Sequence, residues 1–286
     1  MSANPKKLAK TLGKRGPHRV LRGDLALAGQ PGVVYTPESG YNLPAVAFGH
    51  DWMTSVARYS KTFEHLASWG IVVAAPDSER GLVPSHRGLA ADLRATLDIC
   101  VGVRLGPGNI SVQPSKVAFA GHGMGASAAV LAARSRDVGA VAALFPARTA
   151  PPAESVAAQL DAPGLVVSGM GEDAGDSEPR AIARAWHGDV VLRQVDGGTS
   201  SQFVEGLRVV SALGVPGKDR AVQRTTRALL TGFLLYHLAG DNAYEPFADD
   251  SELPGTTVVD PDAEQDSGST DAKSLLAHSS QLLGRK

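Results

Sequence analysis

Val117-Ala118-Phe119-Ala120-Gly121-His122-Gly123-Met124-Gly125-Ala126-Ser127 is the stretch that decides the fold. An apolar run ends at Ala120, a glycine-rich turn follows, and small residues from Ala126 to Arg134 favour a helix. The pattern predicts a buried strand, a sharp turn and a helix that follows directly. Glycines on both sides of the central position fit this prediction, because so tight a turn leaves no room for side chains there.

The turn has the spacing of the G-x-S-x-G motif, in which a nucleophilic side chain stands at the centre of a strand–turn–helix unit. The central position of this chain holds Gly123, which carries neither a hydroxyl nor a thiol. We therefore expect the geometry of the motif without its chemistry. The run lacks the G-x-G-x-x-G spacing of a dinucleotide-binding loop and lies in the middle of the chain, so we expect no dinucleotide there.

Composition places the chain among globular proteins. Of its 286 residues 43% are apolar and the formal net charge is −1, which predicts a sizeable core and no nucleic-acid partner. The single cysteine, Cys100, lies in an apolar helical context and is predicted to be buried and inert. The sequence contains no secretory h-region in residues 1–22 and no apolar run of about 18 residues, so we expect a soluble, cytoplasmic protein.

Charge is distributed unevenly and suggests three regions. Residues 1–22 carry basic side chains and no acid, whereas residues 241–271 are strongly acidic and contain few large apolar side chains. We predict a basic arm at 1–22, one domain at 23–240, and a disordered acidic tail at 241–286. The arm is either a solvated terminus or a contact site for an anionic membrane, for a protein or for the acidic tail itself.

Strand-like and helix-like stretches alternate along the central region. This alternation predicts an α/β fold with a mostly parallel sheet covered by helices on both faces. Apolar runs indicate strands, and apolar residues three or four positions apart indicate helices. The expected strands are Arg19–Ala28, Gly32–Tyr35, Ala45–Phe48, Ile71–Ala75, Val117–Ala120, Val138–Phe145, Leu165–Val167 and Val190–Val195, and the expected helices are Tyr59–Ser68, Arg87–Val101, Ala126–Arg134, Glu178–His187 and Ala221–Leu238.

Polar and glycine-rich stretches follow four of the predicted strands, at the edge where such sheets carry their functional groups. These stretches are His50–Trp52, Gly121–Gly125, Gly171–Asp173 and Gly197–Ser201. Together with the segments FGHDW (48–52) and FEHLASWGIVVAAPD (63–77), they resemble the α/β-hydrolase superfamily over roughly residues 19–238. The branch that is most similar contains the dienelactone hydrolases, cutinases and polyester hydrolases. The resemblance implies an α/β-hydrolase fold.

The resemblance also implies a catalytic triad in the order nucleophile, acid, histidine. It places the nucleophile at Gly123 and the acid at Asp173, with Glu172 as a neighbour that could replace it. The histidine position falls on Ser200. Two of the three members are then missing, and Asp173 is expected to make only local hydrogen bonds.

An oxyanion hole is the second feature that the resemblance implies. Its donors would be the backbone N–H groups of Met124 and Trp52, which a substitution other than proline does not delete. Asp51 stands where relatives usually carry glycine, so its negative charge is expected close to the hole, where it opposes an oxyanion. His50 and His122 are expected to support the loop and the strand structurally. The sequence shows neither metal-ligand spacing nor a phosphate-binding loop, so we expect no metal and no cofactor.

Three functions remain open on the sequence. The favoured hypothesis is a catalytically degenerate hydrolase-like protein that binds a small apolar or ester-like ligand, or a protein. The second is an ester or lactone hydrolase with a non-standard site. Ser127 is a poor nucleophile for it, because it lies one helical turn past Gly123 and is expected to point into helix packing. The third is a scaffold that acts through its charged termini.

Overall fold

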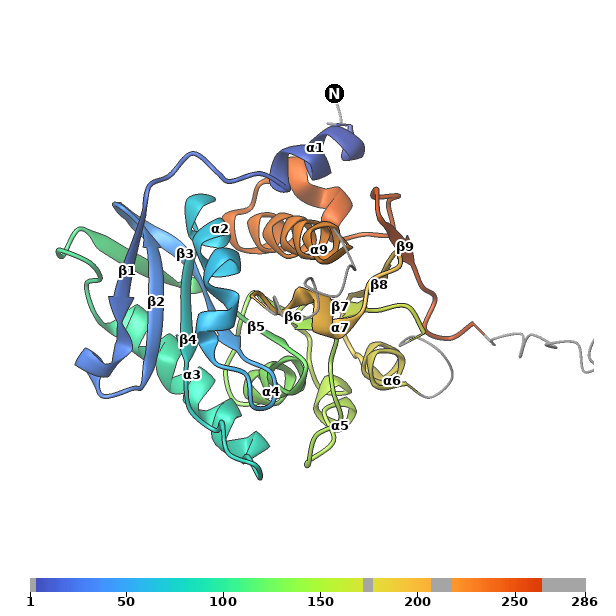
Figure 1. Cartoon of the computed structure of the whole chain (residues 1–286), viewed down its shortest axis with the longest axis horizontal. Coiled ribbons are helices and arrows are strands. Elements are labelled where there is room, and N and C mark those ends of the chain that lie inside the picture. Colours follow the sequence, from blue (N-terminus) through green and yellow to red (C-terminus); the bar gives the residue numbers. More distant parts are fainter. Residues whose placement is uncertain (1–3, 172–176, 207–217, 264–286) are drawn as a thin grey trace, which may run out of the picture.

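One nine-stranded sheet lies at the centre of the computed structural model, which describes residues 4–171, 177–206 and 218–263 (Figure 1). The strand order is β1-β2-β4-β3-β5-β6-β7-β8-β9. Strands β3 to β8 are parallel, β2 is antiparallel to both its neighbours, and β9 is antiparallel to β8. The strands are β1 Val20–Asp24, β2 Gly32–Pro37, β3 Gly40–Gly49, β4 Val72–Pro76, β5 Ile110–His122, β6 Ala140–Leu144, β7 Gly164–Ser168, β8 Val190–Val195 and β9 Thr256–Val258.

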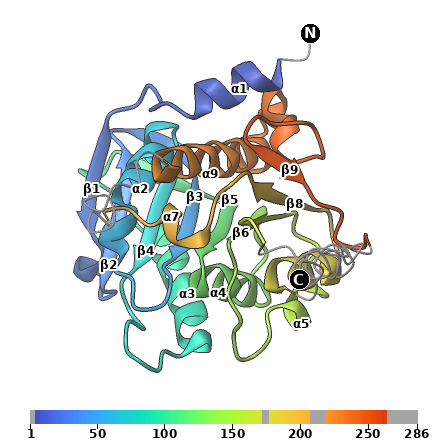
Figure 2. The same cartoon turned by 45° about the vertical axis from the view of Figure 1, so that its right-hand side comes forward.

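Helices connect these strands and cover both faces of the sheet (Figure 2). The α-helices are α1 Pro5–Leu12, α2 Ser60–Ser68, α3 His86–Gly102, α4 Met124–Ala133, α5 Glu154–Ala157, α6 Glu178–Ala185, α7 Ser200–Phe203 and α9 Lys218–Leu234. Shorter turns are η1 Leu25–Ala28, η2 Val56–Tyr59, η3 Leu235–Ala239, which has π geometry, and η4 Asn242–Phe247. The predicted α/β class with a mostly parallel sheet is therefore confirmed, and the strand order is compatible with an α/β-hydrolase fold.

The alternation of side chains along each strand divides the core into two layers. On β3, Ala45 and Ala47 face the layer formed with α3, α4, α5 and α6. Val46 and Phe48 face the layer formed with α1, α2, α7 and α9. Cys100 is buried in the first layer, and burial raises the pKa of its thiol to about 12, as expected for an inert cysteine. None of the helices in the described residues combines the length and apolarity needed to cross a membrane.

The basic arm predicted at 1–22 is part of the domain in its described portion. Residues 5–12 form α1, whose Leu12 is fully buried against the layer that contains α9, and β1 starts at Val20 within the same stretch. The sequence prediction overlooked the helical spacing of Leu8 and Leu12 because lysines at positions 6, 7, 10 and 14 lie among and around them. A short amphipathic helix needs few apolar positions to dock.

The acidic tail predicted to start at 241 also differs from the structure. Residues 242–247 form η4, and β9 extends the sheet at 256–258. Phe247 and Leu253 are buried in the same layer as α9. Residues 264–286 lie outside the described part of the chain. Composition averaged over 241–286 hid the two apolar anchors among many acidic neighbours.

A buried cation fixes this segment to the sheet. Arg193 on β8 is fully buried, and one of its Nη atoms donates to the backbone carbonyls of Pro246, Asp249 and Ser251 at 3.3, 2.7 and 2.8 Å. Burial lowers the pKa of the guanidinium to about 10, and the charges of Asp249 and Asp250 oppose this effect. A buried guanidinium needs such acceptors, so the fold requires the segment that supplies them.

Phe247→Ala is expected to lower the free energy of unfolding by about 3–5 kcal/mol, because it removes a fully buried ring that lies against Gly232 of α9. Urea denaturation followed by circular dichroism measures this loss. Leu27→Ala is the matched control, since Leu27 is exposed and its loss is expected to change stability by no more than about 0.5 kcal/mol. Equal stability of the two variants would show that 241–263 does not belong to the domain.

Candidate functional site

The turn between β5 and α4 has the sharp geometry predicted from the glycine-rich run. Gly123 links the two elements with φ 57° and ψ −120°. This is the conformation of the first central residue of a type II′ turn, which glycine adopts without strain. The N-terminus of α4 lies directly on the end of β3, because a Cβ on Gly125 would overlap the backbone of Gly49. The sequence therefore predicted this part of the site correctly.

The carboxylate of Asp51 occupies the position opposite Gly123. Its Oδ1 accepts hydrogen bonds from the backbone N–H of Met124 at 2.9 Å and from the backbone N–H of Trp52 at 2.8 Å. These are the two groups that the resemblance named as oxyanion donors. A Cβ on Gly123 would overlap the Asp51 carboxylate, so the carboxylate fills the space in which a nucleophilic side chain at residue 123 would begin.

The position of Asp51 agrees with the expectation from sequence and goes further. We expected its charge beside the two N–H groups, where it would oppose an incoming anion. The structure has the carboxylate hydrogen-bonded to both of them. Met124 is the first residue of α4, and the N-terminus of a helix favours a negative charge through its unpaired N–H groups and its dipole. Asp51 is thus an intramolecular ligand of an anion-binding turn.

His122 lies behind this turn as the last residue of β5 and is fully buried. Its Nδ1 lies 2.9 Å from the hydroxyl oxygen of Tyr59, and its Nε2 lies 3.1 Å from the carbonyl oxygen and 3.0 Å from Oγ of Ser200. The rings of Tyr59, Phe145 and Phe203 pack around the imidazole. Burial lowers the pKa of His122 to about 4, although the charge of Asp51 and the Ser200 hydrogen bond oppose the shift.

The contact of Nε2 with a backbone carbonyl is the basis for assigning a tautomer to this neutral imidazole. A carbonyl only accepts, so we assign the proton to Nε2, which donates it to the Ser200 carbonyl. Nδ1 is then the acceptor of the Tyr59 hydroxyl proton, and the Tyr59 oxygen in turn accepts the backbone N–H of Asp51 at 3.1 Å. A continuous chain therefore runs from Asp51 through Tyr59 and His122 to Ser200.

The remaining predicted residues support the loops around this chain. Both ring nitrogens of His50 lie at 2.7–2.8 Å from backbone carbonyl oxygens, those of Asp51 and Ser78. The hydroxyl of Ser127 donates to the carbonyl of Ala147 at 2.6 Å, so it points into packing as expected. Ser200 is the first residue of α7, which a capping box between Thr199 and Gln202 starts. Asp173 and Glu172 lie outside the described residues.

Tyr59 is the site residue that the sequence did not reveal. It appeared only as the start of a predicted helix, and no motif singles it out. Its one signal is chemical: a tyrosine in an apolar stretch that becomes buried needs a partner for its hydroxyl. Burial raises the pKa of Tyr59, so the hydroxyl keeps the proton that it donates to His122.

A metal centre finds no support among the residues that the structure describes, since no three His, Cys, Asp or Glu side chains lie close enough together to hold an ion. Among known proteins, no family model matches the chain, and no curated protein has a matching sequence.

Gly123→Ala is expected to destabilise the protein by about 1–3 kcal/mol or more, because alanine there is strained and its Cβ displaces Asp51. In an Asp51→Gly background the same substitution is expected to cost less, with a coupling energy of about 0.5–3 kcal/mol. A double-mutant cycle from urea denaturation measures the coupling. Strict additivity of the two substitutions would contradict the contact between residue 123 and the carboxylate.

Acid is expected to destabilise the protein through His122. In the window from about pH 6.5 down to about pH 4 the unfolded chain protonates this histidine and the folded chain does not, so the stabilisation present above pH 6.5 falls by about 1.4 kcal/mol per pH unit. His65 adds a similar slope, because burial and the charge of Arg227 lower its pKa to about 4. Unfolding free energies of the wild type and of His122→Asn, measured across this window, should differ in slope by about one proton. Parallel pH profiles would contradict a neutral buried His122.

Proposed function

We propose that this chain is an α/β-hydrolase-type protein that has lost hydrolysis and serves as a binding protein. The strand order, the φ and ψ of Gly123 and the helix that starts at Met124 support the hydrolase-type ancestry. The observation that carries the proposal is the hydrogen bonding of Asp51 Oδ1 to both Met124 N–H and Trp52 N–H.

The Asp51 carboxylate removes the electrostatic part of ester hydrolysis. An oxyanion needs free N–H donors aimed at the position where its charge develops, and the loss of one such donor typically lowers kcat about 10²–10³-fold. Here both donors already bind a fixed anion, which also repels a second negative charge. Stabilisation of a tetrahedral intermediate at this turn would require Asp51 to leave.

Among the described residues of the site, no nucleophile stands beside a base that could activate it. Gly123 has no side chain, and the Ser200–His122 pair is the arrangement in the described site that most resembles a serine with its base. With the proton assigned to Nε2, which donates it to the Ser200 carbonyl, the imidazole directs no lone pair at the Ser200 hydroxyl. These points weigh against the alternative of an active ester or lactone hydrolase.

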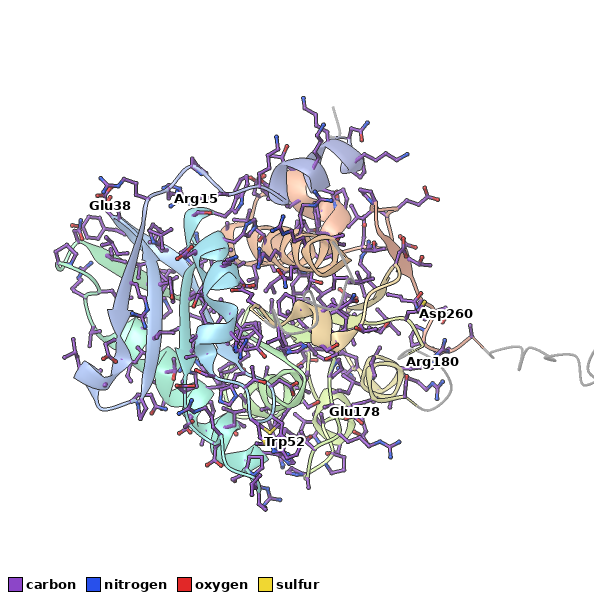
Figure 3. All side chains as sticks on the ribbon, in the orientation of Figure 1. Arg15, Glu38, Trp52, Glu178, Arg180 and Asp260 are labelled. Carbon is purple, nitrogen blue, oxygen red and sulfur yellow. The ribbon has the colours of Figure 1, made fainter. Side chains whose placement is uncertain are left out.

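Exposed apolar side chains follow three of the parallel strands at this edge of the sheet. Trp52 and Met53 follow β3, Leu82 and Val83 follow β4, and Met170 follows β7, all exposed and all after the carboxyl ends of parallel strands. Trp52 lies at the lower edge of the molecule in Figure 3. Trp and Met are enriched in protein interfaces, and groups of exposed apolar residues mark interaction sites. The binding partner that fits best is therefore a protein, in preference to a small ester-like ligand.

The proposal predicts binding without hydrolysis. We expect no labelling by a fluorophosphonate probe and no turnover of p-nitrophenyl butyrate above background. A photo-crosslinking amino acid at Val83 should capture one discrete partner, and Trp52→Ala should abolish this capture. The matched control is the same crosslinker at Leu27, which is 93% exposed against 94% for Val83 but lies on η1, away from the carboxyl ends of β3, β4 and β7.

Two outcomes would contradict the proposal. Turnover with kcat/KM near ~10⁴ M⁻¹s⁻¹ would be that of a working enzyme, and its loss in Ser200→Ala would identify Ser200 as the nucleophile. Equal crosslinking from positions 83 and 27 would show that the exposed apolar residues at this edge bind no specific partner.

A further inference from the structure

A groove lies on another side of the molecule, between α1, α9 and the segment 247–254. Its volume is about 460 Å³, within the range of roughly 300–1,000 Å³ that small-molecule sites occupy. Helices α1 and α9 lie side by side along the top in Figures 1 and 2, whereas Trp52 lies at the lower edge in Figure 3. The groove is therefore separate from the Asp51 site, and its occupant is independent of the proposed function.

The floor of the groove is apolar. Ala228 and Leu229 of α9, together with Phe247 and Leu253, line it and are buried parts of the second core layer. These side chains are held by the packing beneath them, so the floor is present before any ligand arrives. A preformed apolar floor suits a hydrocarbon group.

The rim of the groove is cationic. Lys6, Lys10 and Lys14 recur every four residues, which places them along one side of α1 and its C-terminal extension, and Arg224 lies on the α9 side. The side chain of Arg224 packs against the end of α1 at Gly13, where a Cβ would meet its Cγ. None of the residues that line the groove is acidic.

These four cations have no ion-pair partner within the residues that the structure describes. Lys6 also borders a neighbouring hollow that contains Asp250 and Glu252, so Lys10, Lys14 and Arg224 are the cations whose charge is least offset. Like charges gathered over an apolar floor repel one another, and a bound anion relieves that repulsion.

We propose that this groove binds a single-chain anionic amphiphile, namely a long-chain carboxylate. Its headgroup would contact Lys10, Lys14 and Arg224, and its hydrocarbon chain would lie on Leu229, Phe247 and Leu253. A protein partner fits less well, because a stable protein interface takes about 20–30 residues on each side, more than the eleven residues that line this groove. A guanidinium with ammonium groups suits a carboxylate through charge-assisted hydrogen bonds.

Displacement of a fluorescent fatty acid by oleate, below the micelle concentration of oleate, tests the proposal on the full-length protein. We expect a Kd in the micromolar range, corresponding to about −8 kcal/mol. Oleyl alcohol has the same chain without the charge and is expected to bind at least about tenfold more weakly. Affinity for oleate should fall with added salt, because the rim charges are exposed to solvent.

Paired charge reversals locate the site. Lys10→Glu with Arg224→Glu is expected to weaken oleate binding by more than about tenfold. Lys7→Glu with Arg22→Glu makes the same change in net charge at exposed positions that do not line the groove. This control is expected to keep its affinity for oleate within about twofold of that of the wild type. Circular dichroism and the melting temperature verify that both double variants are folded.

Three results would overturn the proposal. The first is no displacement of the probe by oleate up to ~100 μM, since this range covers even weak micromolar binding. The others are equal affinities for oleate and oleyl alcohol, and equal losses of oleate affinity in the two double variants. Binding to phosphatidylglycerol vesicles without binding of monomeric oleate would also overturn it, since the cations would then recognise a membrane surface and not a ligand in the groove.

Discussion

The site depends on one carboxylate oxygen held by two backbone N–H groups. Asp51 Oδ1 joins Met124, the first residue of α4, to Trp52 in the loop after β3. Because any side chain at residue 123 would overlap this carboxylate, Gly123 and Asp51 are two parts of one arrangement. The aspartate supplies a carboxylate to these N–H groups, so their hydrogen bonds are satisfied within the chain itself.

The same aspartate starts a buried polar chain. Its backbone N–H reaches Tyr59, Tyr59 reaches His122, and His122 reaches Ser200. Buried polar groups are tolerated when each has a partner. Here each donor of the hydrogen-bonded chain has an N or O acceptor, and aromatic rings surround His122. The imidazole thereby ties η2 and α7 to the end of β5. His122 in its neutral form makes two hydrogen bonds that hold neighbouring elements in place. Protonation of its Nδ1 would break the hydrogen bond that Tyr59 donates.

The sequence pattern predicted correctly those features that depend on steric contacts between residues close together in the chain. The apolar runs predicted the parallel strands, and the glycines around residue 123 predicted the sharp turn, because these features depend on near neighbours in sequence. The direction of the Asp51 side chain could not be predicted, since it depends on two N–H groups, one of them 73 residues away. The hydrogen bond between Tyr59 and His122 could not be predicted either, because the two residues are 63 positions apart in the sequence. The sequence showed that residue 123 has no side chain, but not that the Asp51 carboxylate fills the space beside it.

Two regions whose structure the sequence did not predict line the groove together with α9. The arm at 1–22 supplies α1 with its lysines, and the supposed tail supplies Phe247 and Leu253. Both were judged by net charge over long windows, whereas docking depends on a few apolar side chains inside those windows. Leu12 and Phe247 are buried against the layer that contains α9, so the lysines of α1 stand at the rim, whereas the segment that contains Phe247 adds apolar side chains to the floor and no acid to the lining. Two segments rich in opposite charges thus line one groove because their few apolar residues hold them in place.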